Sequence, residues 1–145
     1  MRFVPADNRE FEPASHEDPR HPGVLKRVIA VKDQLLDGRV QMINWARLPI
    51  ESSFRAHYHE DMQEVFMLLS GRAAMTVDGK VVTMEPGDTV VVSPREVHSM
   101  KNVGDQIVQY IVMGISLGQN GQTIVVDGGM ALNYFDKDII NKVVR

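Results

Sequence analysis

Two histidines and a glutamate lie close together near the middle of the chain, and a third histidine follows. His57 and His59 are two residues apart, and residues i and i+2 of a β-strand face the same side, so the two imidazoles could share one ion. Glu64 lies beyond a polar turn, where a hairpin-like return of the next strand would bring its carboxylate alongside them. His98 follows a run of valines, so three of the five histidines would converge with one glutamate.

Each of these residues alone has an ordinary structural explanation. A His-x-His pair on a strand is more often a surface or core pair than a site, Glu64 could be a solvated turn residue, and His98 could brace a loop. Their joint spacing favours a site. The chain has no Ser-His-Asp spacing, no phosphate-binding glycine loop and no helical His-Glu-x-x-His motif, so other catalytic chemistry is not indicated.

Short apolar segments separated by turns must position these residues. Strands are expected where β-branched and apolar residues cluster, at 24–31, 39–50, 64–69, 72–77, 80–84, 89–93, 106–115 and 122–127. Segments of this kind are typical of an all-β sandwich or barrel. Residues 1–23 contain four prolines and are expected to form an extended arm. The apolar residues at 135, 139 and 143 have helical spacing and predict a short C-terminal helix.

The histidine and glutamate spacing resembles the first motif of the cupin superfamily. His57-x-His59, four residues, Glu64, six residues and Gly71 match that motif. Glu51 stands at the position where the motif begins with glycine. The resemblance covers residues 39–115, which include the expected barrel core.

The second cupin motif is also present, with two changes. Gly87, His98 and Asn102 keep the required intervals. The proline is displaced by one residue to Pro94, and Arg95 stands in place of a glycine. Because a residue other than glycine rarely adopts a positive φ, Arg95 is expected to disturb the local turn.

The resemblance implies a fold and a cofactor. The fold is a double-stranded β-helix, a jelly-roll-like barrel, over residues 24–134, with the arm at 1–23 before it and the helix at 135–145 after it. The cofactor is one divalent transition metal inside the barrel, bound by His57, His59, Glu64 and His98. Mixed imidazole and carboxylate sites accept Fe, Mn, Ni, Co, Cu or Zn, so the ligand types do not select the metal.

Strand alternation proposes pocket residues around the ion. Arg55 has the parity of the histidine pair and could bind an anionic substrate, although a cation at a strand end is as readily a surface residue. Residues of the strand before the site and of the late strand could line the mouth. The candidates are Arg55, Phe66, Trp45, Gln109 and Tyr110.

Composition limits the partners. The 145 residues carry 16 Lys and Arg against 19 Asp and Glu, a net charge of −3, which argues against nucleic acid and a polybasic membrane anchor. The absence of cysteine excludes disulfides, thiolate nucleophiles and Cys-rich metal sites. No signal peptide and no apolar run of about 18 residues is present, so a cytoplasmic protein without membrane contact is expected.

One strand is apolar on both faces. Val65, Met67 and Leu69 point to one side, and Phe66 and Leu68 point to the other. The outer face of an antiparallel sheet is apolar when something covers it. The cover is either the N-terminal arm or a second subunit, and we favour a homodimer.

Two functions fit these features. The first is a metal-dependent enzyme that acts on a small oxygen-rich metabolite by dioxygenase, isomerase or lyase chemistry at the metal. The second is a non-catalytic module that binds a small ligand such as a sugar or an organic acid. No catalytic residue is assigned.

Overall fold

The structure is a computed structural model of the chain, and it describes residues 1–5, 10–36, 38–116, 122–127 and 130–133. It confirms the all-β fold. The described strands are β1 (Glu12–Pro13), β2 (Leu25–Val31), β3 (Val40–Leu48), β4 (His57–His59), β5 (Met62–Ser70), β6 (Ala73–Val77), β7 (Lys80–Met84), β8 (Thr89–Val92), β9 (His98–Asn102), β10 (Val108–Ser116), β11 (Thr123–Asp127) and β12 (Met130–Asn133). A short 3-10 turn, η1 (Lys32–Gln34), follows β2. The helix expected at 135–145 lies outside the described residues.

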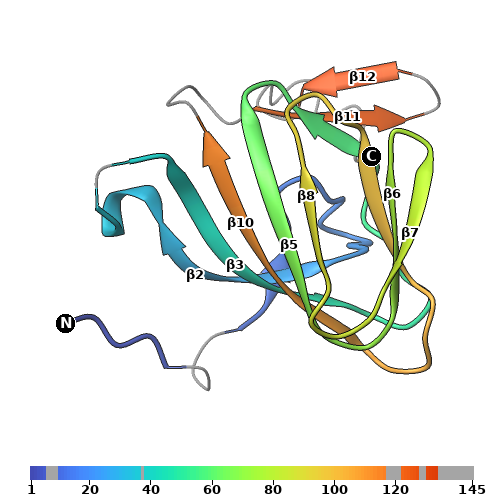
Figure 1. Ribbon diagram of the computed structural model, residues 1–145, viewed down its shortest axis with the longest axis horizontal. Coiled ribbons are helices and arrows are strands. Elements are labelled where there is room, and N and C mark those ends of the chain that lie inside the picture. Colours follow the sequence, from blue (N-terminus) through green and yellow to red (C-terminus); the bar gives the residue numbers. More distant parts are fainter. Residues whose placement is uncertain (6–9, 37, 117–121, 128–129, 134–145) are drawn as a thin grey trace.

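Two antiparallel sheets of six strands each form the barrel. The strand order is β1-β2-β3-β10-β5-β8 in one sheet and β12-β11-β4-β9-β6-β7 in the other. Figure 1 shows β3, β10, β5 and β8 side by side, with β6 and β7 beyond them. The chain crosses between the sheets repeatedly, and two of these crossings lie between β4 and β5 and between β8 and β9. The hairpin-like pairing expected for the two segments that carry His57 and Glu64 is therefore wrong, because they belong to different sheets.

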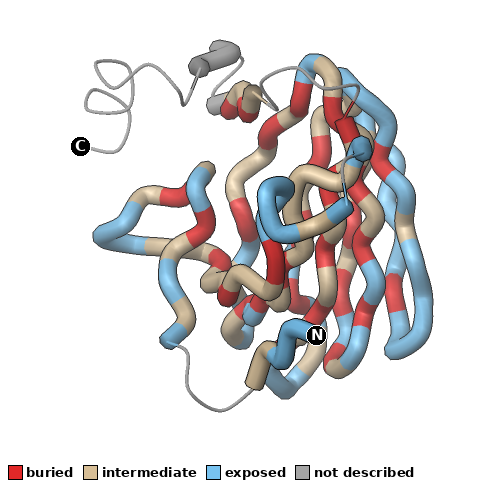
Figure 2. Tube along the Cα trace, turned by 90° about the vertical axis from the view of Figure 1, so that its left-hand side faces the viewer, coloured by how far each residue is buried: buried red, intermediate tan, exposed pale blue. Residues whose placement is uncertain are grey.

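Alternating side chains fill the space between the sheets. Val108, Tyr110 and Val112 of β10 are buried, as are Phe66 and Leu68 of β5. Figure 2 shows the same alternation of buried and less buried positions along the strands. This period of two is what a sheet with one face toward a core requires. It places the cluster of aromatic, aliphatic and methionine side chains inside the barrel.

The arm begins as part of the first sheet. Glu12 and Pro13 pair with Lys26 and Leu25 of β2. Before them, the Phe11 ring lies under the guanidinium groups of two arginines, 5.1 Å from Arg27 and 4.6 Å from Arg47. Such cation–π contacts tie the arm to the edge of the sheet. Among the described residues, no helix is long and apolar enough to cross a membrane, and the cytoplasmic location stays a prediction.

Both motif positions that lack glycine adopt the left-handed conformation. Glu51 has φ 65° and Arg95 has φ 70°, each as the third residue of a four-residue turn closed by a backbone hydrogen bond. This is the type II geometry that usually selects glycine. The expected disturbance at Arg95 is not found, because its N–H donates to the His59 carbonyl at 2.7 Å and its guanidinium pairs with Glu60 at 3.2 Å.

Replacing Glu51 with glycine should stabilise the fold. A positive φ costs about 1–2 kcal/mol for a residue with a Cβ, and the added flexibility of glycine costs about 0.5–1 kcal/mol. We expect E51G to raise the free energy of unfolding by up to about 1 kcal/mol in urea titrations. The reverse change, from glycine to a residue with a Cβ, should be unfavourable. We expect G71A to lower the free energy of unfolding by about 2 kcal/mol or more, since a Cβ there would lie 2.9 Å from the Val108 Cα. A clear loss of stability in E51G would contradict this account.

Candidate metal centre

Four buried side chains from both sheets meet inside the barrel. His57 and His59 extend from β4, and His98 extends from β9, directly opposite His57 in the strand pairing. Glu64 extends from β5 in the other sheet. One ligand atom of each residue lies within 4.8 Å of those of the other three. The structure thus brings together all four residues that the sequence proposes as ligands.

Backbone carbonyls hold the three imidazoles in place. The Nδ1 of His57 lies 2.7 Å from the Arg55 carbonyl oxygen, and the Nδ1 of His98 lies 2.9 Å from that of Glu96. The Nδ1 of His59 lies 3.2 Å from the Gln122 carbonyl oxygen. A carbonyl only accepts hydrogen bonds, so each Nδ1 donates a proton to its carbonyl and each ring turns its Nε2 toward the centre. Outer contacts of this kind orient histidines that bind metals.

The charges of the cluster are strongly coupled. The Glu64 Oε1 lies 2.8 Å from His59 Nε2 and 3.0 Å from His98 Nε2. Burial opposes the charge on Glu64, but its hydrogen bonds to the two imidazoles outweigh burial and lower its pKa well below the usual range. Burial alone would lower the pKa of His59, and the hydrogen bond and charge of Glu64 outweigh it, so that this pKa is raised. Burial and the neighbouring histidines lower the pKa of His57.

This donor set fits a divalent metal ion. The Glu64 carboxylate stays ionised, and the Nε2 atoms of the three histidines face a common point. A cation at this point would contact all four groups and would replace the proton that His59 now shares with Glu64. Three imidazoles and one carboxylate suit several transition metals and leave coordination positions for a ligand. His57, His59, Glu64 and His98 could therefore hold one metal ion.

A cavity of about 240 Å³ adjoins the cluster. Phe66 and Tyr110 line it, as expected from strand alternation. Trp45 and Gln109 do not line the cavity. They lie on the outer face of the sheet, where Trp45 Nε1 donates a hydrogen bond of 2.9 Å to Gln109 Oε1. Arg55 is not among the lining residues either, although its carbonyl orients His57. Strand parity could not place Trp45 and Gln109, because the sequence does not show which face of β3 and β10 turns inward.

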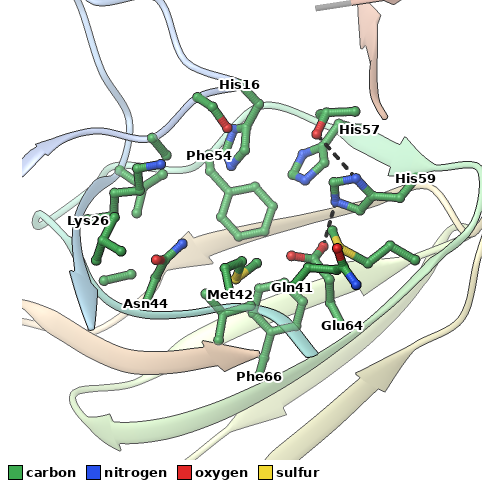
Figure 3. Close-up of a pocket in the computed structure, with 18 of the residues that line it drawn as sticks. His16, Lys26, Gln41, Met42, Asn44, Phe54, His57, His59, Glu64 and Phe66 are labelled. Atoms are coloured by element: carbon green, nitrogen blue, oxygen red, sulfur yellow. Dashed lines mark hydrogen bonds and ion pairs between the residues drawn. The ribbon is translucent and has the colours of Figure 1, made fainter. Parts of the chain in front are cut away.

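The arm contributes a residue that the sequence analysis does not single out. The His16 ring stacks on His57, with 4.1 Å between centroids and 23° between planes, and it lines the cavity. Figure 3 shows His16 above Phe54, beside the histidine cluster. Burial, with the charges of nearby histidines, lowers the pKa of His16 to about 3. No periodicity in the proline-rich arm marks this position, so the sequence carries no signal for it.

Glu17 anchors the arm next to His16. It is buried, and its carboxylate accepts hydrogen bonds from the backbone N–H groups of Arg55, Gly23 and Val24. Burial raises its pKa to about 7 even though these hydrogen bonds oppose the shift. A carboxyl with such a pKa takes up a proton in the neutral range, where free glutamic acid is ionised.

The family comparison agrees with this architecture. The profile of the family described as Cupin domain matches residues 44–114. A crystal structure of a predicted oxalate decarboxylase from Thermotoga maritima superposes with a TM-score of 0.71 at 24% sequence identity, covering 80% of this chain and 100% of that one. Residues 44–114 are therefore a cupin domain, which places this part of the chain in the cupin superfamily.

Two curated relatives match part of the chain. An uncharacterized protein of Methanocaldococcus jannaschii is 29% identical over 85 residues, covering 59% of this chain and 59% of that protein. A protein of Thermotoga maritima named oxalate-binding protein is 24% identical over 95 residues, covering 66% of this chain and 78% of that protein. The match to the first relative thus spans little more than half of its length.

The raised pKa of Glu17 predicts a pH effect on stability. The folded state binds the proton of Glu17 more tightly than the unfolded state does, so protonation stabilises the fold. This stabilisation is complete below about pH 4.5 and is lost as the pH rises through 7. Glutamine does not titrate, so E17Q should not lose this stabilisation as the pH rises. We expect the free energy of unfolding of E17Q, relative to that of wild type, to be about 2–3 kcal/mol higher at pH 8 than at pH 5. Urea unfolding at both pH values measures this difference. The exposed Glu10 serves as control, and a change as large in E10Q would count against the assignment.

Proposed function

We propose that the protein is a metal-dependent cupin enzyme that acts on a small, oxygen-rich organic anion bound at the metal. The observation that carries this proposal is the meeting of four buried ligand atoms within 4.8 Å of one another beside a cavity. A bound metal would polarise a coordinated oxygen or orient a chelating substrate. Dioxygenase, isomerase and lyase chemistry all use such a centre, and the residues present do not select among them.

The protein's own groups would prepare the site. The carbonyl-bound imidazoles hold their Nε2 atoms toward the centre, and Glu64 supplies a negative charge that a divalent ion more than neutralises. Tyr110 lines the cavity, and its pKa is raised well above the usual value by burial and by the charges of Glu64 and Glu17. Its hydroxyl therefore remains protonated at neutral pH and could donate a hydrogen bond to a bound anion.

The alternative is binding without turnover. The name of the Thermotoga maritima relative, oxalate-binding protein, supports an organic acid as ligand and favours this alternative as much as catalysis. Assays of turnover and of saturable binding with the same set of organic acids distinguish the two functions. An enzyme would convert an acid that it binds, whereas a binding module would bind it unchanged.

Metal content tests the proposal most directly. We expect purified protein to carry about one transition metal ion per chain, and H59A to bind it more than about 100-fold more weakly, since loss of a contact to an outer residue alone costs 10–100-fold. Elemental analysis and titration with a competing chelator measure both. H21A, in the exposed part of the arm, should bind metal like wild type. Protein that contains no metal and takes up none would contradict the proposal.

We also propose that the protein forms a homodimer through the outer face of β5 and β8. Met67, Leu69 and Val91 are exposed there, at 39%, 44% and 51%. Val91 pairs with Val65, so these side chains form one apolar surface. The Phe11 side chain contacts Arg27 and Arg47 of β2 and β3, at the other end of the sheet, so a second copy is the better cover for β5.

A charge on this surface should separate the dimer. We expect wild type to have the mass of two chains at micromolar concentration in light scattering, and M67K to have the mass of one, because a lysine would lose its hydration in the interface. Val81 is similarly exposed on β7 of the other sheet, so V81K should remain dimeric. A wild-type mass of one chain would exclude the dimer.

A further inference from the structure

A lysine occupies the inward row of β2, next to the short edge strand β1. Lys26 pairs with Ala46, and Val28 pairs with Asn44, so these four side chains share the inner face of β2 and β3. Val24, which has the same parity, is fully buried. Lys26 lines the cavity, although its neighbours in this row are apolar. A cation in such a row has a cost in solvation unless a counter-charge accompanies it.

No carboxylate of the residues that the structure describes supplies that counter-charge. Within the part of the chain that the structure describes, no ion pair to Lys26 forms within 4.0 Å. Glu12 is its partner in the backbone pairing, but that side chain is exposed and does not line the cavity. An anion from outside the protein is therefore the partner that the Lys26 ammonium lacks.

A further polar atom at this end of the cavity has no hydrogen-bond partner. It is Oδ1 of Asn44, a residue that is 8% exposed. Buried polar atoms are nearly always hydrogen-bonded in proteins, so atoms without partners beside a cavity indicate a ligand. The Asn44 amide also carries two N–H donors, and turning it over would present them to a carboxylate.

The cavity therefore has two polar ends with an apolar wall between them. Figure 3 shows His57, His59 and Glu64 on one side of Phe54, and Lys26 and Asn44 on the other. Phe54, Phe66 and Met42 line the space between. The volume of about 240 Å³ equals that of roughly eight water molecules, which is room for roughly eight to twelve non-hydrogen atoms. A two-carbon diacid has six and would leave the far end empty.

We propose that the Lys26 ammonium and the Asn44 amide form a distal subsite for the second carboxylate of a dicarboxylic acid of about five carbons. This inference rests on the proposed function, because the first carboxylate would bind the metal. It adds the chemical class of the ligand and the residues that select its length. The apolar wall suits the methylene groups between the two carboxylates.

Calorimetric titration with glutarate and butyrate tests the subsite, because butyrate has one carboxylate and similar length. We expect wild type to bind glutarate at least tenfold more tightly than butyrate. A hydrogen bond to a charged group accounts for a factor of about 10–150. K26M should lose this preference and keep the affinity for butyrate, whereas K80M, changed at an exposed lysine on β7, should retain it. N44L should also lose the preference.

The outcomes separate this inference from the proposed function. Metal content and melting temperature are measured first for every variant, so that a folding defect is recognised. Metal-loaded wild type that binds neither acid or does not distinguish them, or K26M that still prefers glutarate, overturns the distal subsite only. Wild type that takes up no metal overturns the proposed function and this inference with it.

Discussion

The contact on which the rest of the site depends is the one between Glu64 and two histidines. Its carboxylate reaches across the barrel from one sheet and accepts hydrogen bonds from His59 and His98 of the other. A buried carboxylate without partners would have a large cost in solvation, so the two sheets must keep this separation and register. The strand pairing of His57 with His98 and the carbonyl contacts of the rings follow from the same constraint.

Turns outside the sheets maintain this register. Arg95 gives its backbone N–H to the carbonyl of His59 while its side chain pairs with Glu60 in the turn between β4 and β5. The segment before His98 is thereby tied to the strand that carries the other two histidines. This explains why a left-handed conformation is kept at a residue with a side chain: the strain lies where it fixes the ligands, which is common at functional sites.

The sequence predicted the features that depend on local pattern. Alternation and turn residues predicted eight of the twelve described strands and missed the short strands β1, β4, β9 and β12. The motif spacing was sufficient to select His57, His59, Glu64 and His98. The pairing of strands that are distant in sequence was not predictable in this way. Glu64 therefore lies across the barrel rather than in a hairpin with His59, and Trp45 faces outward. His16 was missed because tertiary packing alone brings the arm over the cavity.

The lining of the cavity comes from two parts of the chain. The four candidate metal ligands fall within the region that matches the cupin profile, residues 44–114, whereas His16 and Lys26 precede it. Mutations in the arm and in β2 can therefore alter what the cavity accepts while the four candidate ligands stay unchanged. In a barrel of this kind, the N-terminal segment could diverge and change which ligand fits while the residues that could hold a metal are conserved.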